Sequence, residues 1–302
     1  MNKKITSNVF LMGTAIIWGF AFVAQRDSMG NMGPFMFSGI RMLLGSLTLV
    51  PIFIFADNRR KKRGEFDNIT AEDRAEERKN LKKGGIAAGI IIFIAANLQQ
   101  VGLVTVDAGK TAFITALYIL LVPLCGIFLK NKTSVFNWIA AIIGAIGLYF
   151  LCITDSFSIA WGDLLVLIGA FFWAFHILVF DRFAPKVDVF KLVSIQFLVA
   201  GVISLFVAFA TETNTLAAIW EEAPNIVYAG MLSSAIAFSL QGLGQKHANP
   251  TVASVILSTE SMFGAIFGAI FLHEVLAGRE LLGCILMMVA ILLAQIPSPK
   301  DK

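Results

Sequence analysis

The sequence predicts an all-α integral membrane protein of ten transmembrane helices in two inverted five-helix repeats. Of its 302 residues, 57% are hydrophobic and only 15% are charged, with a mean hydropathy of +0.79. That composition leaves too little polar surface for a water-soluble globule of this size. Apolar stretches of membrane-spanning length recur along the chain, and short motifs of the first half return in the second.

Ten apolar stretches follow one another, each close to the roughly 20 residues that a helix needs to cross a bilayer. Hydrocarbon offers no partner to unpaired backbone groups, and no stretch alternates with the period of a membrane strand, so each is expected to be helical. The stretches cover residues 9–24, 33–55, 84–105, 108–129, 135–153, 161–180, 189–210, 224–244, 250–272 and 281–296.

The lysines and arginines favour one orientation in the membrane. If the amino terminus is cytoplasmic, 20 of the 24 basic residues lie on the cytoplasmic side and three lie outside, while Arg41 is inside the membrane. Such an asymmetry is the positive-inside pattern of membrane proteins. We therefore expect a multi-pass protein of the cytoplasmic membrane, with both termini cytoplasmic, membrane lipid around it and no basic patch left for nucleic acid.

One sizeable polar segment, residues 57–83, interrupts the apolar stretches. Its basic cluster, residues 59–63, could contact anionic lipid heads or a regulator, but a solvated linker that carries topology charges is the favoured interpretation. Further along, Thr70 and Asp73 have the spacing of a capping box, which predicts a short helix after Thr70.

A motif shared by the two halves indicates an internal repeat. Leu-Gln-Gln-Val-Gly at 98–102 matches Leu-Gln-Gly-Leu-Gly at 240–244, an offset of 142 residues. The same offset relates Tyr118 to Glu260.

A second match, at an offset of 155 residues, relates Trp18 to Trp173. The longer segment 57–83 accounts for the difference between the two offsets. We expect a first repeat at 1–154, with the charged cytoplasmic loop 57–83, and a second at 155–302. Because each has five helices, the second enters the membrane from the opposite side, as in many secondary transporters.

Two charged residues lie deep inside apolar stretches. Glu260 is near the middle of 250–272, where a carboxylate costs about 2.5–3.5 kcal/mol to insert, so a functional role is favoured over a structural hydrogen bond. Arg41 lies about 12 Å into its helix. Its guanidinium could pair with Glu260 or with an anionic group of a substrate; snorkelling or a structural ion pair is the alternative.

Six uncharged or neutral polar and aromatic residues at membrane depth are further candidates for substrate binding or coupling. Each also has a plain structural interpretation: a satisfied core hydroxyl, amides that join helices, close-packed indoles, or a packing histidine. They are Tyr118, Gln99 and Gln241, Trp18 and Trp173, and His176, whose near-neutral reference pKa would suit proton transfer.

Common catalytic and nucleotide-binding signatures are absent from the sequence. There is no phosphate-binding GxxxxGK[ST], no HExxH and no GxSxG, and the histidines and cysteines lack metal-ligand spacing. We expect no catalytic residues, no metal and no cofactor.

The chain resembles the EamA type of the drug/metabolite transporter superfamily along nearly its whole length. Two departures concern the ninth apolar stretch: the family's Glu-Pro is Glu260-Ser261 here, which removes a proline break, and its Leu-Gly-Glu is Leu272-His273-Glu274. The resemblance rests on Trp18-Gly-Phe-Ala-Phe22, Ser38-Gly-Ile-Arg-Met-Leu-Leu44, Leu117-Tyr118, Val122-Pro123 and Glu260.

The resemblance implies ten helices in two inverted repeats around a central cavity, alternating access, and export of amino acids, related metabolites or amphiphilic drugs. We therefore expect a secondary transporter of small molecules, most simply of amino acids, either proton-coupled or facilitative. A multidrug or nucleotide-sugar-type transporter of the same fold is the alternative. An intramembrane enzyme or a channel would be a different class, and a monomer and a homodimer both remain open.

Overall fold

The computed structural model describes residues 3–65, 69–129, 133–153, 160–271 and 278–296, without the side chains of Cys152 and of 268–271. Within these ranges the chain is helical and contains no strand. Its α-helices are α1 (Lys3–Asp27), α2 (Pro34–Lys62), α3 (Ala71–Gly102), α4 (Ala108–Ala116), α5 (Tyr118–Phe128), α6 (Val135–Cys152), α7 (Trp161–Phe183), α8 (Val189–Thr211), α9 (Leu216–Glu221), α10 (Ala223–Val227), α11 (Phe238–Gln245), α12 (Pro250–Leu257), α13 (Glu260–Phe271) and α14 (Gly278–Ala294).

Each predicted apolar stretch contains helix, and eight helical segments of the described chain are long and apolar enough to cross a membrane. A shorter apolar helix covers Val135–Leu151. The prediction of an all-α, multi-pass membrane protein is therefore confirmed. Whether ten segments span the bilayer, and whether the halves are inverted, stays a prediction.

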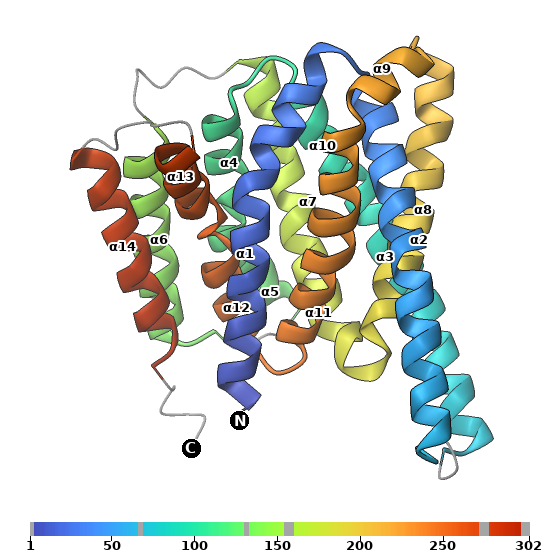
Figure 1. Ribbon diagram of the computed structural model, residues 1–302. Coiled ribbons are helices and arrows are strands. Elements are labelled where there is room, and N and C mark those ends of the chain that lie inside the picture. The colour runs from blue at the N-terminus through green and yellow to red at the C-terminus, as the bar shows by residue number, and fades with distance from the viewer. Residues whose placement is uncertain (1–2, 66–68, 130–132, 154–159, 272–277, 297–302) are drawn as a thin grey trace.

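The long helices stand side by side in one bundle (Figure 1). On one side α2 packs on α8, and α3 packs on both α7 and α8; on the other, α6 packs on α14. Helix α1 contacts α11, α13 and the π-helical segment Tyr228–Ala237 (η3), which joins α10 to α11. Segments from both halves of the chain therefore surround the centre of the bundle.

The start of α1 and the last described residues lie at the same end of the bundle, which we call the amino-terminal end. There the ammonium of Lys4 donates to the Gln295 carbonyl at 2.9 Å, and the amide of Asn8 donates to Gln295 Oε1 at 2.9 Å. Figure 1 shows α2 and α3 projecting beyond the other helices at this end.

The predicted capping box at Thr70 is present, but the helix that it begins is not short. Thr70 Oγ1 accepts from the Asp73 backbone N–H, and the Asp73 carboxylate accepts from the Thr70 N–H, both at 3.1 Å. Helix α3 then continues for 32 residues into the third apolar stretch. The sequence between Asp73 and Gly84 contains no proline or glycine that would end a helix, so the capped helix continues into the membrane stretch.

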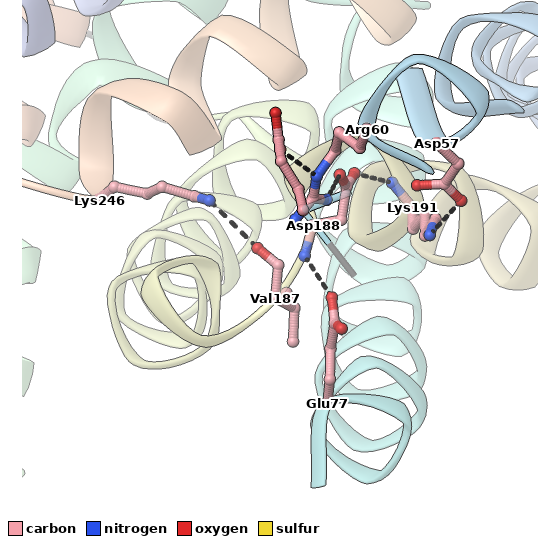
Figure 2. A network of polar contacts seen from close by, with 8 residues as sticks. Asp57, Arg60, Glu77, Val187, Asp188, Lys191 and Lys246 are labelled. Carbon is pink, nitrogen blue, oxygen red and sulfur yellow. Dashed lines mark hydrogen bonds and ion pairs between the residues drawn. The ribbon is translucent and has the colours of Figure 1, made fainter. Parts of the chain in front are cut away.

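A network of charged residues joins α2 and α3 to the start of α8 at the amino-terminal end (Figure 2). The Lys191 ammonium lies 2.6 Å from the Asp57 carboxylate, and Arg60 lies 3.8 Å from Asp188. Glu77 accepts from the Asp188 N–H at 3.3 Å. Both halves of the chain contribute, so the network ties them together at this end.

The network extends to the residue that follows α11. Lys246 donates to the Val187 carbonyl at 3.1 Å (Figure 2). Burial lowers the pKa of Lys246, and the positive charge of Arg60 lowers it further, while Asp188 and Glu77 act in the opposite direction.

Candidate functional site

Two of the predicted membrane helices are interrupted at their centres. The stretch 108–129, predicted as one helix, is divided into α4 and α5 at Leu117, and 250–272 is divided into α12 and α13 at Ser258-Thr259. At both breaks a backbone N–H bonds to the carbonyl three residues earlier, and not four as in an α-helix. Leu117 N–H donates to Ile114 O at 3.3 Å, and Thr259 N–H donates to Ile256 O at 3.2 Å. Such a 3₁₀-like turn inside a helix often marks a functional hinge.

The second break occurs without a proline, because Ser261 stands here where the family has the proline of its Glu-Pro dipeptide. Local hydroxyls take over part of the hydrogen bonding instead. Ser258 Oγ donates to the Val255 carbonyl at 2.9 Å, and Thr259 Oγ1 donates to the Ile256 carbonyl at 2.6 Å. Serine and threonine side chains that bond back to the preceding turn bend or interrupt helices.

Each break places a polar residue first in the helix that follows it. Tyr118 is the first residue of α5, and Glu260 is the first residue of α13. Both side chains are buried, each 3% exposed, and the Tyr118 hydroxyl donates to Glu260 Oε1 at 3.1 Å. The two residues that the 142-residue offset relates are thus direct partners.

Tyr118 and Glu260 contribute to the wall of a cavity at the centre of the bundle. About 410 Å³ there is free of protein atoms, solvent-connected space included. The lining comes from α1, α2, α3, α4, α5, α7, η3, α11 and α13, and consists of Trp18, Ala21, Phe22, Gln25, Arg41, Gln99, Thr115, Tyr118, Trp173, Ser233, Phe238 and Glu260.

Three aromatic rings from three helices form one side of the cavity. The centroid of Trp18 lies 4.7 Å from that of Phe238 and 6.4 Å from that of Trp173, and Trp173 lies 6.1 Å from Phe238. Both indole N–H groups have acceptors: Trp18 donates to the Ser233 carbonyl at 3.1 Å, and Trp173 donates to Gln99 Oε1 at 2.9 Å. With their N–H groups satisfied, the rings form an apolar wall.

The acceptor of Trp18 belongs to the π-helical segment η3. A π-helix is rare and is found most often at functional sites, because its wider turn alters which carbonyls remain available. Here α1 supplies two donors: Trp18 to the Ser233 carbonyl, and Thr14 to the Ala237 carbonyl at 3.0 Å. The π turn thereby fixes the position of α1 beside the cavity.

Arg41 lines the same cavity but does not pair with Glu260. Its side chain is 4% exposed, and within the described part of the chain it has neither an ion pair nor a hydrogen bond; Nε is buried without an acceptor. The guanidinium carbon lies 5.9 Å from the centroid of the Phe37 ring.

Two of the predicted candidates are buried outside the cavity wall. Gln241 donates to Gln245 Oε1 at 2.9 Å, towards the amino-terminal end, and Gln245 donates to the Ile177 carbonyl at 2.9 Å. His176 shares a 2.8 Å hydrogen bond with Gln196, behind the aromatic wall. Six of the eight predicted candidates therefore meet at the cavity.

Some lining residues were missed by the sequence interpretation. Gln25 and Phe22 follow Trp18 at offsets of seven and four, so helical spacing could have placed them on its face. Ser233 lines the cavity from the π-helical segment η3, which no sequence pattern predicted. In the described residues there is no group of three or more His, Cys, Asp or Glu side chains arranged to hold a metal ion.

Comparison with known proteins identifies relatives that align along most of the chain. The chain is 24% identical over 304 residues to an uncharacterized transporter of Archaeoglobus fulgidus, covering 97% of this chain and 87% of that one. It is also 24% identical to the uncharacterized transporter YoaV of Bacillus subtilis, covering 92% of each chain. A solved structure titled "Crystal structure of protein" superposes with a TM-score of 0.77 at 16% identity over 99% of both chains, which shows a shared fold.

The family comparison covers almost the whole chain. The model of the EamA-like transporter family matches residues 5–153 and again residues 160–295. This protein therefore belongs to the EamA-like transporter family.

Proposed function

We propose that the protein is a secondary transporter that exports small metabolites, most simply amino acids or related compounds, through the central cavity by alternating access. One observation carries the proposal: two interrupted helices meet at the cavity wall through the bond between Tyr118 and Glu260. Interrupted helices around a site deep in the bundle are characteristic of secondary transporters, because they let a polar site exist at membrane depth and change shape there.

The proposed architecture has ten membrane helices in two inverted five-helix repeats. The separate family matches to 5–153 and 160–295 support a boundary near residue 154. The helix breaks support it as well, because Leu117 and Thr259 are separated by the same 142 residues as Tyr118 and Glu260.

The position of the cavity supports alternating access. It includes Gln99 but not Gln241, its counterpart at the offset of 142, and it includes Arg41 but not Gln196, its counterpart at 155. In an inverted repeat such counterparts lie towards opposite ends of the bundle. A cavity displaced to one end is what one of two alternating states requires; in the other state the cavity would reach Gln241 and Gln196.

The packing towards the amino-terminal end is close. Thr14 donates to the Ala237 carbonyl, Leu11 is fully buried, and the charged network of Figure 2 joins the two halves beyond them. In the orientation expected from the basic residues this end is cytoplasmic, so the close packing supports a proposed state that is closed towards the cytoplasm. Cysteines introduced at exposed Glu72 and Thr213, in a chain without the native cysteines, test the orientation: an impermeant thiol reagent applied to intact cells should label only the one at 213.

Glu260 is the proposed coupling residue. Its identified side-chain partner is a neutral hydroxyl, and in the described residues no cation lies within ion-pair distance of it. It can therefore gain or lose a proton without breaking a salt bridge, which suits a residue that couples transport to protons.

Counterflow in proteoliposomes tests the function. Vesicles loaded with an unlabelled amino acid should accumulate the same labelled amino acid faster than empty vesicles, for at least one member of a panel of amino acids and related metabolites. A channel would show no such acceleration, and an enzyme would alter the compound. Glu260→Gln should keep counterflow but lose uptake driven by a pH gradient, whereas Glu222→Gln, at a buried carboxyl away from the cavity, should keep both. If Glu260→Gln keeps pH-driven uptake at the wild-type rate, Glu260 does not couple transport to protons.

A further inference from the structure

The charges of the cavity wall are few and separate. Among the described lining residues, Arg41 is the base and Glu260 is the carboxylic acid. No ion pair joins their side chains. Both are more than nine-tenths buried. The wall therefore contains a positive group that its negative group does not neutralise directly.

Several other inward-lying charges of the described residues have partners, whereas Arg41 has neither an ion pair nor a hydrogen bond. Arg26 donates to the Leu103 and Val104 carbonyls, Lys110 lies 2.7 Å from Asp163, and Glu212 accepts the N–H groups that begin α2. A buried charge without a partner is strongly unfavourable, so natural proteins retain one where something else binds it. Arg41 differs from the others in facing the cavity.

We propose that Arg41 binds the carboxylate of the transported substrate, an assignment that deepens the proposed function and rests on it. A guanidinium is a planar fork of N–H donors whose geometry matches a carboxylate, and its unpartnered Nε–H adds to that capacity. A phosphate dianion fits less well. Among the described residues of the wall Arg41 is the single cation, so it can balance one charge of an anion but not both charges of a phosphate dianion.

The rest of the wall defines the body of this substrate. The rings of Trp18, Trp173 and Phe238 present apolar faces, because their polar N–H groups already have acceptors. Phe22 and Ala21 add further apolar surface. The site therefore selects a carboxylate attached to an apolar or aromatic body, with Arg41 determining the specificity for the acid.

Matched ligands test this on the wild-type protein, so that the result does not depend on a variant that folds. Calorimetric titration of purified protein should show that 3-phenylpropionate binds at least tenfold more tightly than its amide, 3-phenylpropionamide, which has the same body without the charge. Inorganic phosphate should not displace the carboxylate. Equal affinity for acid and amide, no binding of the acid, or displacement by phosphate would each overturn the assignment.

Variants identify the residue. Arg41→Gln should lose at least tenfold in affinity for 3-phenylpropionate with little change for the amide, and Arg41→Lys should recover part of the difference. Arg182→Gln, at an exposed arginine near the end of α7, is the matched control and should bind as the wild type does. If Arg41→Gln lowers the affinity for acid and amide alike, Arg41 supports the shape of the cavity and not the carboxylate.

The binding result and the counterflow result separate the two proposals. Acid-selective binding that depends on Arg41, without counterflow of any tested compound, would contradict transport and leave the carboxylate site standing. Counterflow by a protein that does not distinguish acid from amide would support transport and contradict the carboxylate site.

Discussion

The hydroxyl of Tyr118 lies 3.1 Å from the carboxylate of Glu260, although 142 residues separate them in the chain. Each is the first residue after a break in its helix. The bond therefore links the two helix breaks, and a movement that separates the start of α5 from the start of α13 would break it. A change in this hydrogen bond would change how readily the Glu260 carboxylate binds a proton.

Replacing Tyr118 by phenylalanine removes this donor and leaves the ring in place. A buried acceptor that loses its donor costs about 1–3 kcal/mol, so the melting temperature of the purified variant in detergent should fall. If the proposed coupling is correct, the pH at which proton-driven uptake is half-maximal should also change. Ile119→Val, a small change at a buried neighbour, should lower the melting temperature without moving that pH. An unchanged pH profile for Tyr118→Phe would show that the bond is purely structural.

Much of the site could be predicted from the sequence because depth follows from helical rise. Arg41 and Glu260 were placed deep inside their stretches by counting residues, and both line the cavity. Their presence in hydrocarbon-length segments is a strong signal, since charged and polar groups there are costly.

What could not be predicted depends on tertiary packing. Neither glycine nor proline adjoins Leu117, and the nearest proline, Pro123, lies inside α5, so the sequence does not locate the end of α4. The π segment η3 likewise depends on how its carbonyls meet α1. Gln241 was chosen because it matches Gln99, but the cavity is displaced towards the end where Gln99 lies, and only a structure reveals that displacement.

Gly19 should not tolerate a side chain. A Cβ built there would lie 2.8 Å from the Glu260 carbonyl oxygen, from the Gly264 nitrogen and from Phe263 Cβ, and the first two are backbone atoms of α13 that cannot turn aside. Gly19→Ala should therefore push α1 away from α13, with a loss of stability of about 1–3 kcal/mol and a larger loss of counterflow.

The matched control for Gly19 is on the same helix. At Gly13 the nearest atom to an added Cβ is the flexible end of Leu240, at 3.4 Å. Gly13→Ala should consequently melt within a degree or two of the wild type and keep its counterflow. Equal tolerance at both positions would mean that α1 does not need its close approach to α13.

Glu222 should contribute to stability in a pH-dependent way. Burial alone raises the pKa of this carboxyl, but hydrogen bonds from Asn225, Ser28 and Asn31 together outweigh burial, so its pKa lies below the ordinary value of 4.5. The unfolded chain then binds the proton more readily than the folded one. The contribution is present above about pH 4.5 and is lost as the pH falls through the lower pKa of the folded state.

Melting temperatures measured between pH 7 and pH 3.5 test the role of Glu222. Glu222→Gln should start from a lower value at pH 7 and fall less steeply with acid than the wild type does. Glu221→Gln, at the exposed neighbouring residue, controls for the loss of one negative charge and should follow the wild-type curve. A curve for Glu222→Gln parallel to that of the wild type would contradict the lowered pKa.

Alternating access makes a final prediction about Gln99 and Gln241, which the repeat relates but the structure separates. Gln99 lines the cavity, whereas Gln241 is 1% exposed and held by Gln245. In a chain without native cysteines, Gln99→Cys should react with a small membrane-permeant thiol reagent in the described state. Gln241→Cys should react slowly there and faster during turnover, as the cavity moves towards the amino-terminal end. A transported substrate should thus change the two rates in opposite directions; a change of both in the same direction would indicate general loosening of the bundle and contradict the exchange of access between the two ends.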